Sequence, residues 1–233
     1  MTLSSFMEEI SRDVGFQYGI QDTRDLAQQI EKRGPDFAHG FLSDQEWPIF
    51  LGFRVHKRRL EWLAGRIASK KAFLSGVPSD LDPASYRRLC VLNDAMRAPY
   101  FQDHPQRCLS LSHSHDYAIA VVANFRIGID LEKVEPRHAA LVKYFCCAEE
   151  QDLIHQMNRS HLLRNIKVTE LWTRKEALAK FLRIGGSLNF KRLNVLQDVV
   201  QTSTNSLELV ELKSTSVQGY SIAVAFHHHP SRA

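Results

Sequence analysis

The chain has 233 residues, of which 44% are hydrophobic and 24% are charged, and its net charge is +4. These values predict a soluble globular protein with one large domain or two small ones, and so mild a positive charge does not by itself imply nucleic acid. The four cysteines form no CxxC pair, and no stretch approaches the ~20 apolar residues of a membrane span. The acidic start predicts no signal peptide. We therefore expect a cytoplasmic protein without a membrane partner, in a reducing compartment.

The first half of the chain is expected to contain helices followed by strands. Residues 1–40 are mixed and polar, which favours irregular structure with one short helix, and a further helix is expected to start near Ser43. Apolar residues recur on one face of residues 57–76, which predicts a long helix that is also rich in basic residues. Residues 108–125 are typical of a strand, a polar turn and a second strand.

The second half repeats that order. A strand is expected over residues 125–134, followed by helices over 138–157 and 168–186. Three antiparallel strands are expected after them, over residues 188–196, 206–214 and 220–229. The pattern predicts an α+β protein with two similar lobes, residues 1–124 and 125–233, each a small antiparallel sheet packed on helices.

Two acidic residues stand close together in the expected strand "IGIDLE". Strand alternation places Gly128, Asp130 and Glu132 on one face. Residues two apart on a strand are roughly 6.5–7 Å apart, so both carboxylates can reach one cation. Like charges this close favour raised pKa values or a bound cation. A solvated polar face would explain the same pattern.

A third acid lies in the expected helix "LWTRKEALAK". Trp172, Glu176 and Lys180 recur at helical spacing and share a face. Taken alone, an exposed Glu–Lys pair with a core tryptophan explains this stretch. Together, Asp130, Glu132 and Glu176 would offer hard oxygen ligands suited to Mg²⁺, with room for water and a substrate phosphate. The combination predicts phosphoryl-type chemistry.

The paired motifs "GIDLE" and "WTRKEALAK" resemble the signature of the 4′-phosphopantetheinyl transferases. "LSLSHSHDYAIAVVA" resembles the segment that precedes it in the Sfp-type class, and "KRRLEWLAGRIASK" resembles the basic helix of the first half. The resemblance runs from about residue 42 to 190, in the order of the family. It implies the double-length form of the fold, a monomer with pseudo-twofold symmetry between its two lobes.

The resemblance also implies the roles of individual residues. Asp130, Glu132 and Glu176 match the family's metal ligands for Mg²⁺, with Mn²⁺ as an alternative. Glu176 matches the base that takes the proton of the carrier serine, directly or through water. Lys180 matches the lysine that faces the diphosphate and helps the leaving group, and Lys175 is a further candidate phosphate contact.

Coenzyme A is the implied co-substrate, and its phosphates are expected to meet basic and polar residues of both lobes. Arginine suits phosphate because its guanidinium donates two parallel hydrogen bonds. Where relatives carry a Gly-Lys-Pro loop beside the adenine, this chain has "MRAP", which puts the role of Arg97 in doubt. The coenzyme A contacts expected from the resemblance are Arg58, Arg66, Arg97, Ser112, His113, Lys175 and Lys180.

The implied reaction moves the phosphopantetheine arm of coenzyme A to a serine of an apo acyl, peptidyl or polyketide carrier protein. Adenosine 3′,5′-bisphosphate leaves. The segment "YFCCAEEQDLIHQM" lies where relatives contact the carrier, so Phe145 and Leu153 could form an apolar patch, with Arg159 and Arg164 opposite an acidic surface. An ordinary amphipathic helix would explain this segment equally well.

Two other functions were weighed against this one. In the first, the basic helix of residues 57–76 binds nucleic acid, but this leaves the three carboxylates unexplained. In the second, the protein is a Mg²⁺-dependent phosphohydrolase, but the sequence lacks the additional acidic or histidine cluster of a two-metal site. Transfer to a carrier protein without a nucleic-acid partner is the function that the sequence predicts.

Overall fold

The computed structural model describes residues 1–75, 83–157, 160–184, 188–202 and 208–228. The chain divides into an amino-terminal unit, Met7–Phe125, and a carboxy-terminal unit, Met1–Phe6 with Arg126–Ala233. Helix α1 (Leu3–Val14) contributes residues to both. Helices accompany three sheets whose strand pairs are all antiparallel, which confirms the α+β class. Within the described part of the chain, no helix is long and apolar enough to cross a membrane.

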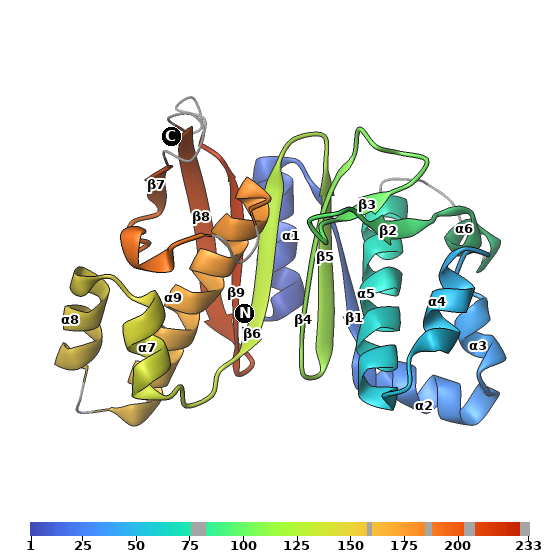
Figure 1. The fold of residues 1–233 in the computed structure, drawn as a ribbon, viewed down its shortest axis with the longest axis horizontal. Helices are drawn as coiled ribbons and strands as arrows, with labels where there is room; N and C mark the ends of the chain where they lie inside the picture. The colour runs from blue at the N-terminus through green and yellow to red at the C-terminus, as the bar shows by residue number, and fades with distance from the viewer. Residues whose placement is uncertain (76–82, 158–159, 185–187, 203–207, 229–233) are drawn as a thin grey trace. The chain divides into compact units, whose positions relative to one another are not determined.

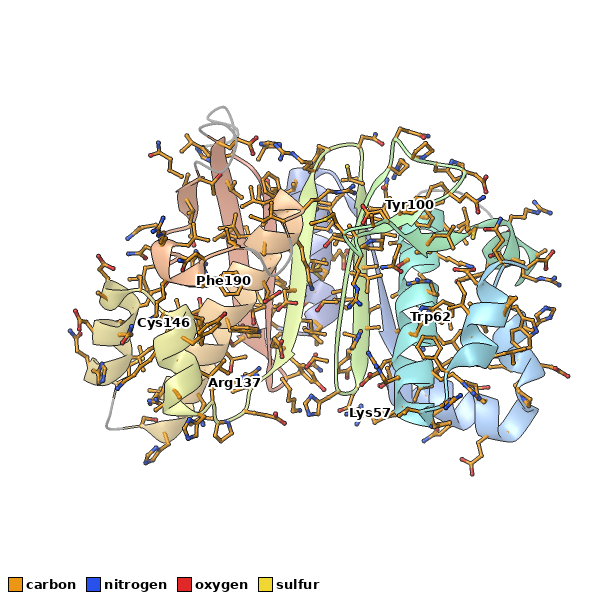
Figure 2. All side chains as sticks on the ribbon, viewed as in Figure 1. Lys57, Trp62, Tyr100, Arg137, Cys146 and Phe190 are labelled. Atoms are coloured by element: carbon orange, nitrogen blue, oxygen red, sulfur yellow. The ribbon has the colours of Figure 1, made fainter. Side chains whose placement is uncertain are left out.

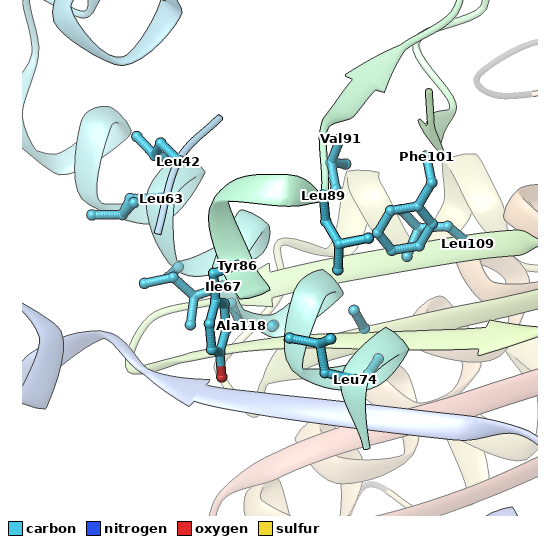
Figure 3. Packing of buried hydrophobic residues seen from close by; sticks show 14 of the residues in the cluster. Leu42, Leu63, Ile67, Leu74, Tyr86, Leu89, Val91, Phe101, Leu109 and Ala118 are labelled. Carbon is cyan, nitrogen blue, oxygen red and sulfur yellow. The ribbon is translucent and has the colours of Figure 1, made fainter. Parts of the chain in front are cut away.

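The amino-terminal unit is built on a three-stranded sheet in the order β1-β5-β4. Its strands are β1 (Gln17–Asp22), β4 (Cys108–Ser114) and β5 (Tyr117–Ala123). Helix α5 (His56–Leu74) packs against all three strands (Figure 1). The apolar side chains between helix and sheet form the core of this unit, and Figure 3 shows part of that cluster.

Shorter elements surround this helix and sheet. They are α2 (Thr23–Arg33), α3 (Asp36–His39), α4 (Glu46–Gly52), α6 (Pro83–Arg88) and the hairpin of β2 (Val91–Asn93) and β3 (Pro99–Phe101).

The carboxy-terminal unit has a four-stranded sheet in the order β6-β9-β8-β7. The strands are β6 (Ile127–Lys133), β7 (Val199–Thr202), β8 (Glu208–Val217) and β9 (Tyr220–His227). Helix α9 (His161–Leu182) packs against β6, β8 and β9. The smaller elements are α7 (Ala139–Phe145), α8 (Ala148–Gln156) and the 3₁₀ helix η2 (Phe190–Arg192).

In each unit a glycine lets the long helix approach the sheet closely. A Cβ on Gly19 of β1 would lie 2.3 Å from the carbonyl oxygen of Ala68 in α5. A Cβ on Gly128 of β6 would lie 2.0 Å from the carbonyl oxygen of Ala177 in α9. Both distances are far below van der Waals contact, so only glycine permits this packing without a backbone shift.

A buried ion pair ties the core of the amino-terminal unit together. Glu46 and Lys70 are both 0% exposed, and the Lys70 ammonium donates to a carboxylate oxygen of Glu46. The same carboxylate accepts from the backbone N–H groups of Ser43 (2.8 Å) and Val91 (3.1 Å). Lys70 also donates to the carbonyl oxygen of Phe41 at 2.8 Å. Such satisfaction of both charges is what a fully buried pair requires.

Two sequence predictions were confirmed closely. The helix expected over residues 57–76 is α5, and the strand–turn–strand expected over residues 108–125 is the β4–β5 hairpin. The prediction for residues 1–40 was wrong, because this segment forms α1, β1 and two further helices. Strand β1 forms because six of its residues pair with β5, a long-range contact that local pattern does not reveal.

Two further predictions in the second half were wrong. The single helix expected over residues 138–157 is split into α7 and α8, because Cys147 is extended and its backbone N–H donates to the Glu150 carboxylate at 2.9 Å. The strand expected over residues 188–196 is instead the 3₁₀ helix η2 with irregular flanks. Gly185 and Gly186, expected to stop the following helix, lie outside the described residues.

Candidate active site

Strand β6 and helix α9 bring two of the expected site residues together. Asp130 is buried, and its Oδ1 accepts a hydrogen bond from the Lys180 ammonium at 2.7 Å. The Asp130 side chain is 5% exposed and that of Lys180 is 29% exposed, so the lysine covers the acid on the solvent side. The contact depends on Gly128, two residues earlier on the same face of β6, because that glycine lets α9 lie directly on the strand.

Glu132 is held by two donors, one on each carboxylate oxygen. The indole N–H of Trp172 donates to Oε1 at 3.1 Å, and the Arg137 guanidinium donates to Oε2 at 3.0 Å. Trp172 is itself fixed by edge-on contacts with the rings of Phe145 and Phe190, whose centroids lie 5.2 and 5.7 Å from its own. Figure 2 shows Phe190 and Arg137 in the same unit.

Glu176 lies one turn before Lys180 on α9. Burial raises the pKa of its carboxyl group, and the negative charge of Asp130 raises it further. The Lys180 ammonium acts in the opposite direction, and Glu132 adds a weaker upward effect. The three carboxylates therefore share one electrostatic neighbourhood, in which Glu176 ionises less readily than a glutamate in water.

The donor set fits a hard divalent cation, because all three groups are carboxylates on facing elements and they repel one another. In the described part of the chain, however, no three His, Cys, Asp or Glu side chains are gathered closely enough to form a ready metal site. Asp130 is paired with Lys180, and Glu132 is paired with Trp172 and Arg137. A cation would have to rearrange at least one of these pairs.

The part of the chain that carries these residues is similar to known proteins. Residues 126–225 match the 4′-phosphopantetheinyl transferase superfamily. A holo-[acyl-carrier-protein] synthase of Streptococcus pyogenes serotype M28 is 35% identical over 112 residues, which are 47% of this chain and 93% of the relative. A second, from serotype M12, is 34% identical over the same shares of both chains.

The chain belongs to the 4′-phosphopantetheinyl transferase superfamily. By homology it is an enzyme of the holo-[acyl-carrier-protein] synthase class. Among solved structures, the synthase of Neisseria meningitidis matches with a TM-score of 0.40 and 23% identity, over 46% of this chain and 94% of that one. The Bacillus anthracis synthase, solved in complex with CoA (3′,5′-ADP), matches with a TM-score of 0.40 and 25% identity, over 46% of this chain and 91% of that one.

The structure corrects the expected role of Lys175 in this transferase. Its side chain is 0% exposed and pairs with the buried Glu150 carboxylate at 2.7 Å. Its ammonium also donates to the backbone carbonyl oxygens of Phe145, Phe190 and Leu193, at 2.7–2.9 Å. With every donor occupied inside the protein, Lys175 holds α9 against its neighbours and is not a phosphate contact.

Arg66 also differs from its expected role. Its side chain is 5% exposed, its guanidinium donates to Asn93 at 2.8 Å, and it lies over the ring of Trp62. Burial lowers its pKa to about 10, against the stabilising charge of Glu46. In this conformation Arg66 ties α5 to the β2–β3 hairpin and does not present a free guanidinium to a ligand.

The other expected coenzyme A contacts are more accessible. Arg58 is exposed on the first turns of α5, and His113 is exposed on β4, next to the buried Ser112. Arg97 is exposed in the β2–β3 turn, where its φ of 63° is left-handed. Their roles remain predictions.

The segment expected to meet the carrier protein is only partly exposed. Phe145 is fully buried, which contradicts the expected apolar patch at this residue, whereas its neighbour Tyr144 is 71% exposed. A pocket of about 180 Å³ lies between α7, α8 and α9, and its lining includes Val142, Ile154 and Arg164. Arg159 lies outside the described residues.

Sequence reasoning missed two residues of the site, Arg137 and Glu150. Arg137 lies in the connection between β6 and α7, where no periodic pattern draws attention to it. Glu150 is recognisable only by comparison of the two halves, because "FLSDQE" and "FCCAEE" place Phe41 and Phe145 at the same distance before a glutamate. That repeated spacing was the signal that could have found it.

Proposed function

We propose that this enzyme transfers the 4′-phosphopantetheine arm of coenzyme A to a serine of an apo carrier protein and releases adenosine 3′,5′-bisphosphate. The observation that carries the proposal is the cluster of Asp130, Glu132 and Glu176 with Lys180, in the part of the chain that matches the transferase superfamily. Carboxylates and a lysine at one place suit phosphoryl transfer, which depends on positioning and charge neutralisation.

In this mechanism Glu176 accepts the proton of the carrier serine, directly or through one water. A carboxylate can act as a general base when it lies within hydrogen-bond reach of the attacking hydroxyl. The serine oxygen forms a bond to the β-phosphorus, and the bond from this phosphorus to the bridging oxygen breaks. Lys180 stabilises the negative charge that develops on the departing bisphosphate.

Asp130, Glu132 and Glu176 would hold a divalent cation, Mg²⁺ or Mn²⁺, which neutralises charge on the diphosphate when bound. Arg58, Arg97, Ser112 and His113 are the proposed contacts for the phosphates and adenine of coenzyme A. Of these, Arg58, Arg97 and His113 are exposed, and Ser112 is buried.

We further propose that the chain is of the Sfp-type, double-length class, a monomer whose lobes, residues 1–124 and 125–233, are related by pseudo-twofold symmetry. Two observations support a common origin of the lobes. Each has a glycine under its long helix. Each also has a buried Glu–Lys pair in which the glutamate accepts from a valine N–H and the lysine donates to a phenylalanine carbonyl oxygen. The client carrier, whether acyl, peptidyl or polyketide, is left open.

The test is the intact mass of apo carrier proteins after incubation with this enzyme, coenzyme A and Mg²⁺. We expect a gain of one phosphopantetheine, which is lost with Asp130→Ala and with a chelator. A matched control is Gln21→Ala, which removes the side chain that accepts a hydrogen bond from Lys71 within the amino-terminal unit and should leave the transfer intact. Absence of the mass gain on acyl, peptidyl and polyketide carriers alike would contradict the proposal.

A further inference from the structure

Arg137 occupies an unusual place beside the proposed metal ligands. It lies in the connection between β6 and α7 (Figure 2), five residues after Glu132. Its guanidinium donates to Oε2 of that glutamate at 3.0 Å. Both side chains are about three-quarters buried, with 23% and 27% exposed. The pair is therefore less screened by water than an ordinary surface ion pair.

The two hydrogen-bond donors to Glu132 differ in whether a cation can bind the carboxylate while the donor stays in place. The Trp172 indole N–H on Oε1 is fixed by the surrounding aromatic rings, and it is neutral, so it can remain while the other oxygen binds a cation. Arg137 on Oε2 carries a full positive charge, so it cannot share that oxygen with a divalent cation without strong repulsion. Ligation through Oε2 thus requires that Arg137 withdraw.

Arg137 is also incompletely satisfied where it lies. Its Nε is buried and has no hydrogen-bond acceptor among the described residues, so only part of the guanidinium fork is used. An arginine fully committed to a structural role normally uses both donors of that edge on a carboxylate. The ion pair between Arg137 and Glu132 is therefore weaker than a bidentate pair, and a competing cation can displace the guanidinium.

We propose that Arg137 is an internal counter-ion that competes with the divalent cation for Glu132 and so lowers the affinity of the metal site. This inference rests on the proposed function, because it assumes that Glu132 is a metal ligand. Arg137 acts through Glu132 and is a positioning residue. Its ion pair keeps the Glu132 carboxylate neutralised and oriented by Trp172 until a cation of sufficient charge displaces the guanidinium.

Direct binding of Mn²⁺, followed by the electron paramagnetic resonance of the free ion, tests this proposal without a turnover assay. Titrations are made with Mn²⁺ alone and again with saturating coenzyme A. Arg137→Gln should bind Mn²⁺ about three- to fivefold more tightly than the wild type, the range expected for loss of a partly buried ion-pair competitor. In the Glu132→Gln background, Arg137→Gln should have no effect.

A matched control separates this effect from a general change of charge. Lys143→Gln removes one positive charge from an exposed position on α7 and should leave Mn²⁺ binding unchanged. Equal or weaker binding by Arg137→Gln, or an effect that persists in the Glu132→Gln background, would overturn the proposal while leaving carrier modification intact. If no variant binds Mn²⁺ in either titration, the inference fails, and a carrier that is still modified shows that the transferase function stands without it.

Discussion

The two units share a buried scaffold but differ in the residues placed on it. In each unit, a fully buried glutamate carboxylate is paired with a lysine of the long helix. The carboxylate also accepts hydrogen bonds from the backbone N–H of the residue three positions earlier and from the backbone N–H of a valine. The lysine also donates a hydrogen bond to the carbonyl oxygen of a phenylalanine. The corresponding sets are Phe41, Ser43, Glu46, Lys70 and Val91 in one unit and Phe145, Cys147, Glu150, Lys175 and Val195 in the other. Because this network occurs in both units, we infer that it serves the fold and not the chemistry.

The positions of the proposed active-site residues, in contrast, carry different side chains in the two units. Two residues after Gly128, Asp130 meets Lys180; two residues after Gly19, Gln21 meets Lys71, whose ammonium donates to the amide oxygen at 2.8 Å. Where the carboxy-terminal unit has Glu132, the amino-terminal unit has Thr23, and the residue after the shared buried lysine is Glu176 in one unit and Lys71 in the other. One unit thus keeps a lysine opposite a neutral amide, and the other gathers three acids.

The largest expected effect comes from breaking the shared network. Lys175→Met should destabilise the protein by about 3–5 kcal/mol, because it leaves the buried Glu150 without its counter-ion. Lys70→Met should cost less, because Arg66 lies 3.7 Å from Glu46 and keeps a positive charge beside it. Chemical denaturation followed by circular dichroism measures the loss. The control Lys143→Met, at an exposed position, should fall within about 0.5 kcal/mol of the wild type.

A large loss from Lys70→Met with little loss from Lys175→Met would contradict this order of effects. The double variant Glu150→Gln with Lys175→Met should recover part of the loss, since it removes the unpaired charge as well.

A smaller effect is expected from the glycines under the long helices. A methyl group on Gly128 would lie 2.0 Å from the Ala177 carbonyl oxygen, and one on Gly19 would lie 2.3 Å from that of Ala68. Gly128→Ala and Gly19→Ala should each cost about 1–3 kcal/mol, the range for overpacking a tight interior. Only Gly128→Ala should also weaken the proposed metal site, because a shift of α9 separates Asp130 from Glu176 and Lys180.

Gly52→Ala is the matched control for these substitutions. Gly52 is exposed at the end of α4, and nothing lies within 4 Å of a Cβ built there. Alanine should be neutral or slightly stabilising at this position. If Gly128→Ala were as stable as the wild type, α9 would have to lie farther from β6 than it does in the structure.

Residue spacing predicted which side chains come together better than it predicted which are buried. The structure brings Asp130, Glu176 and Lys180 close to one another, as strand alternation and helical spacing indicated. The burial of a side chain could not be predicted from spacing alone. Lys175 and Arg66 were predicted to contact phosphate, but both are buried against residues that are distant in sequence. A charged residue on a helix is recognisable as internal only once its counter-ion is known, and Glu150 belongs to a different helix.

The smallest expected effect concerns the charge of Glu176, where the amino-terminal unit has Lys71. Burial and the neighbouring Asp130 raise the pKa of Glu176 in the folded state above its unfolded value. Stability from this group is therefore fully present below the unfolded pKa and is lost as the pH rises through the folded pKa. In the presence of a chelator, Glu176→Gln should raise the melting temperature at pH 8 by about 2–4 °C, and the gain should disappear toward acidic pH.

Glu149→Gln provides the control of opposite sign. Its backbone N–H and a hydrogen bond with Cys147 lower the pKa of the Glu149 carboxyl group at the start of α8, so its ionised form favours the fold and its removal should bring no gain at pH 8. Replacing the chelator with Mg²⁺ should stabilise the wild type more than Glu176→Gln, because only the wild type offers all three carboxylates. A stability difference for Glu176→Gln that does not change with pH would show that repulsion among the three acids is not its source.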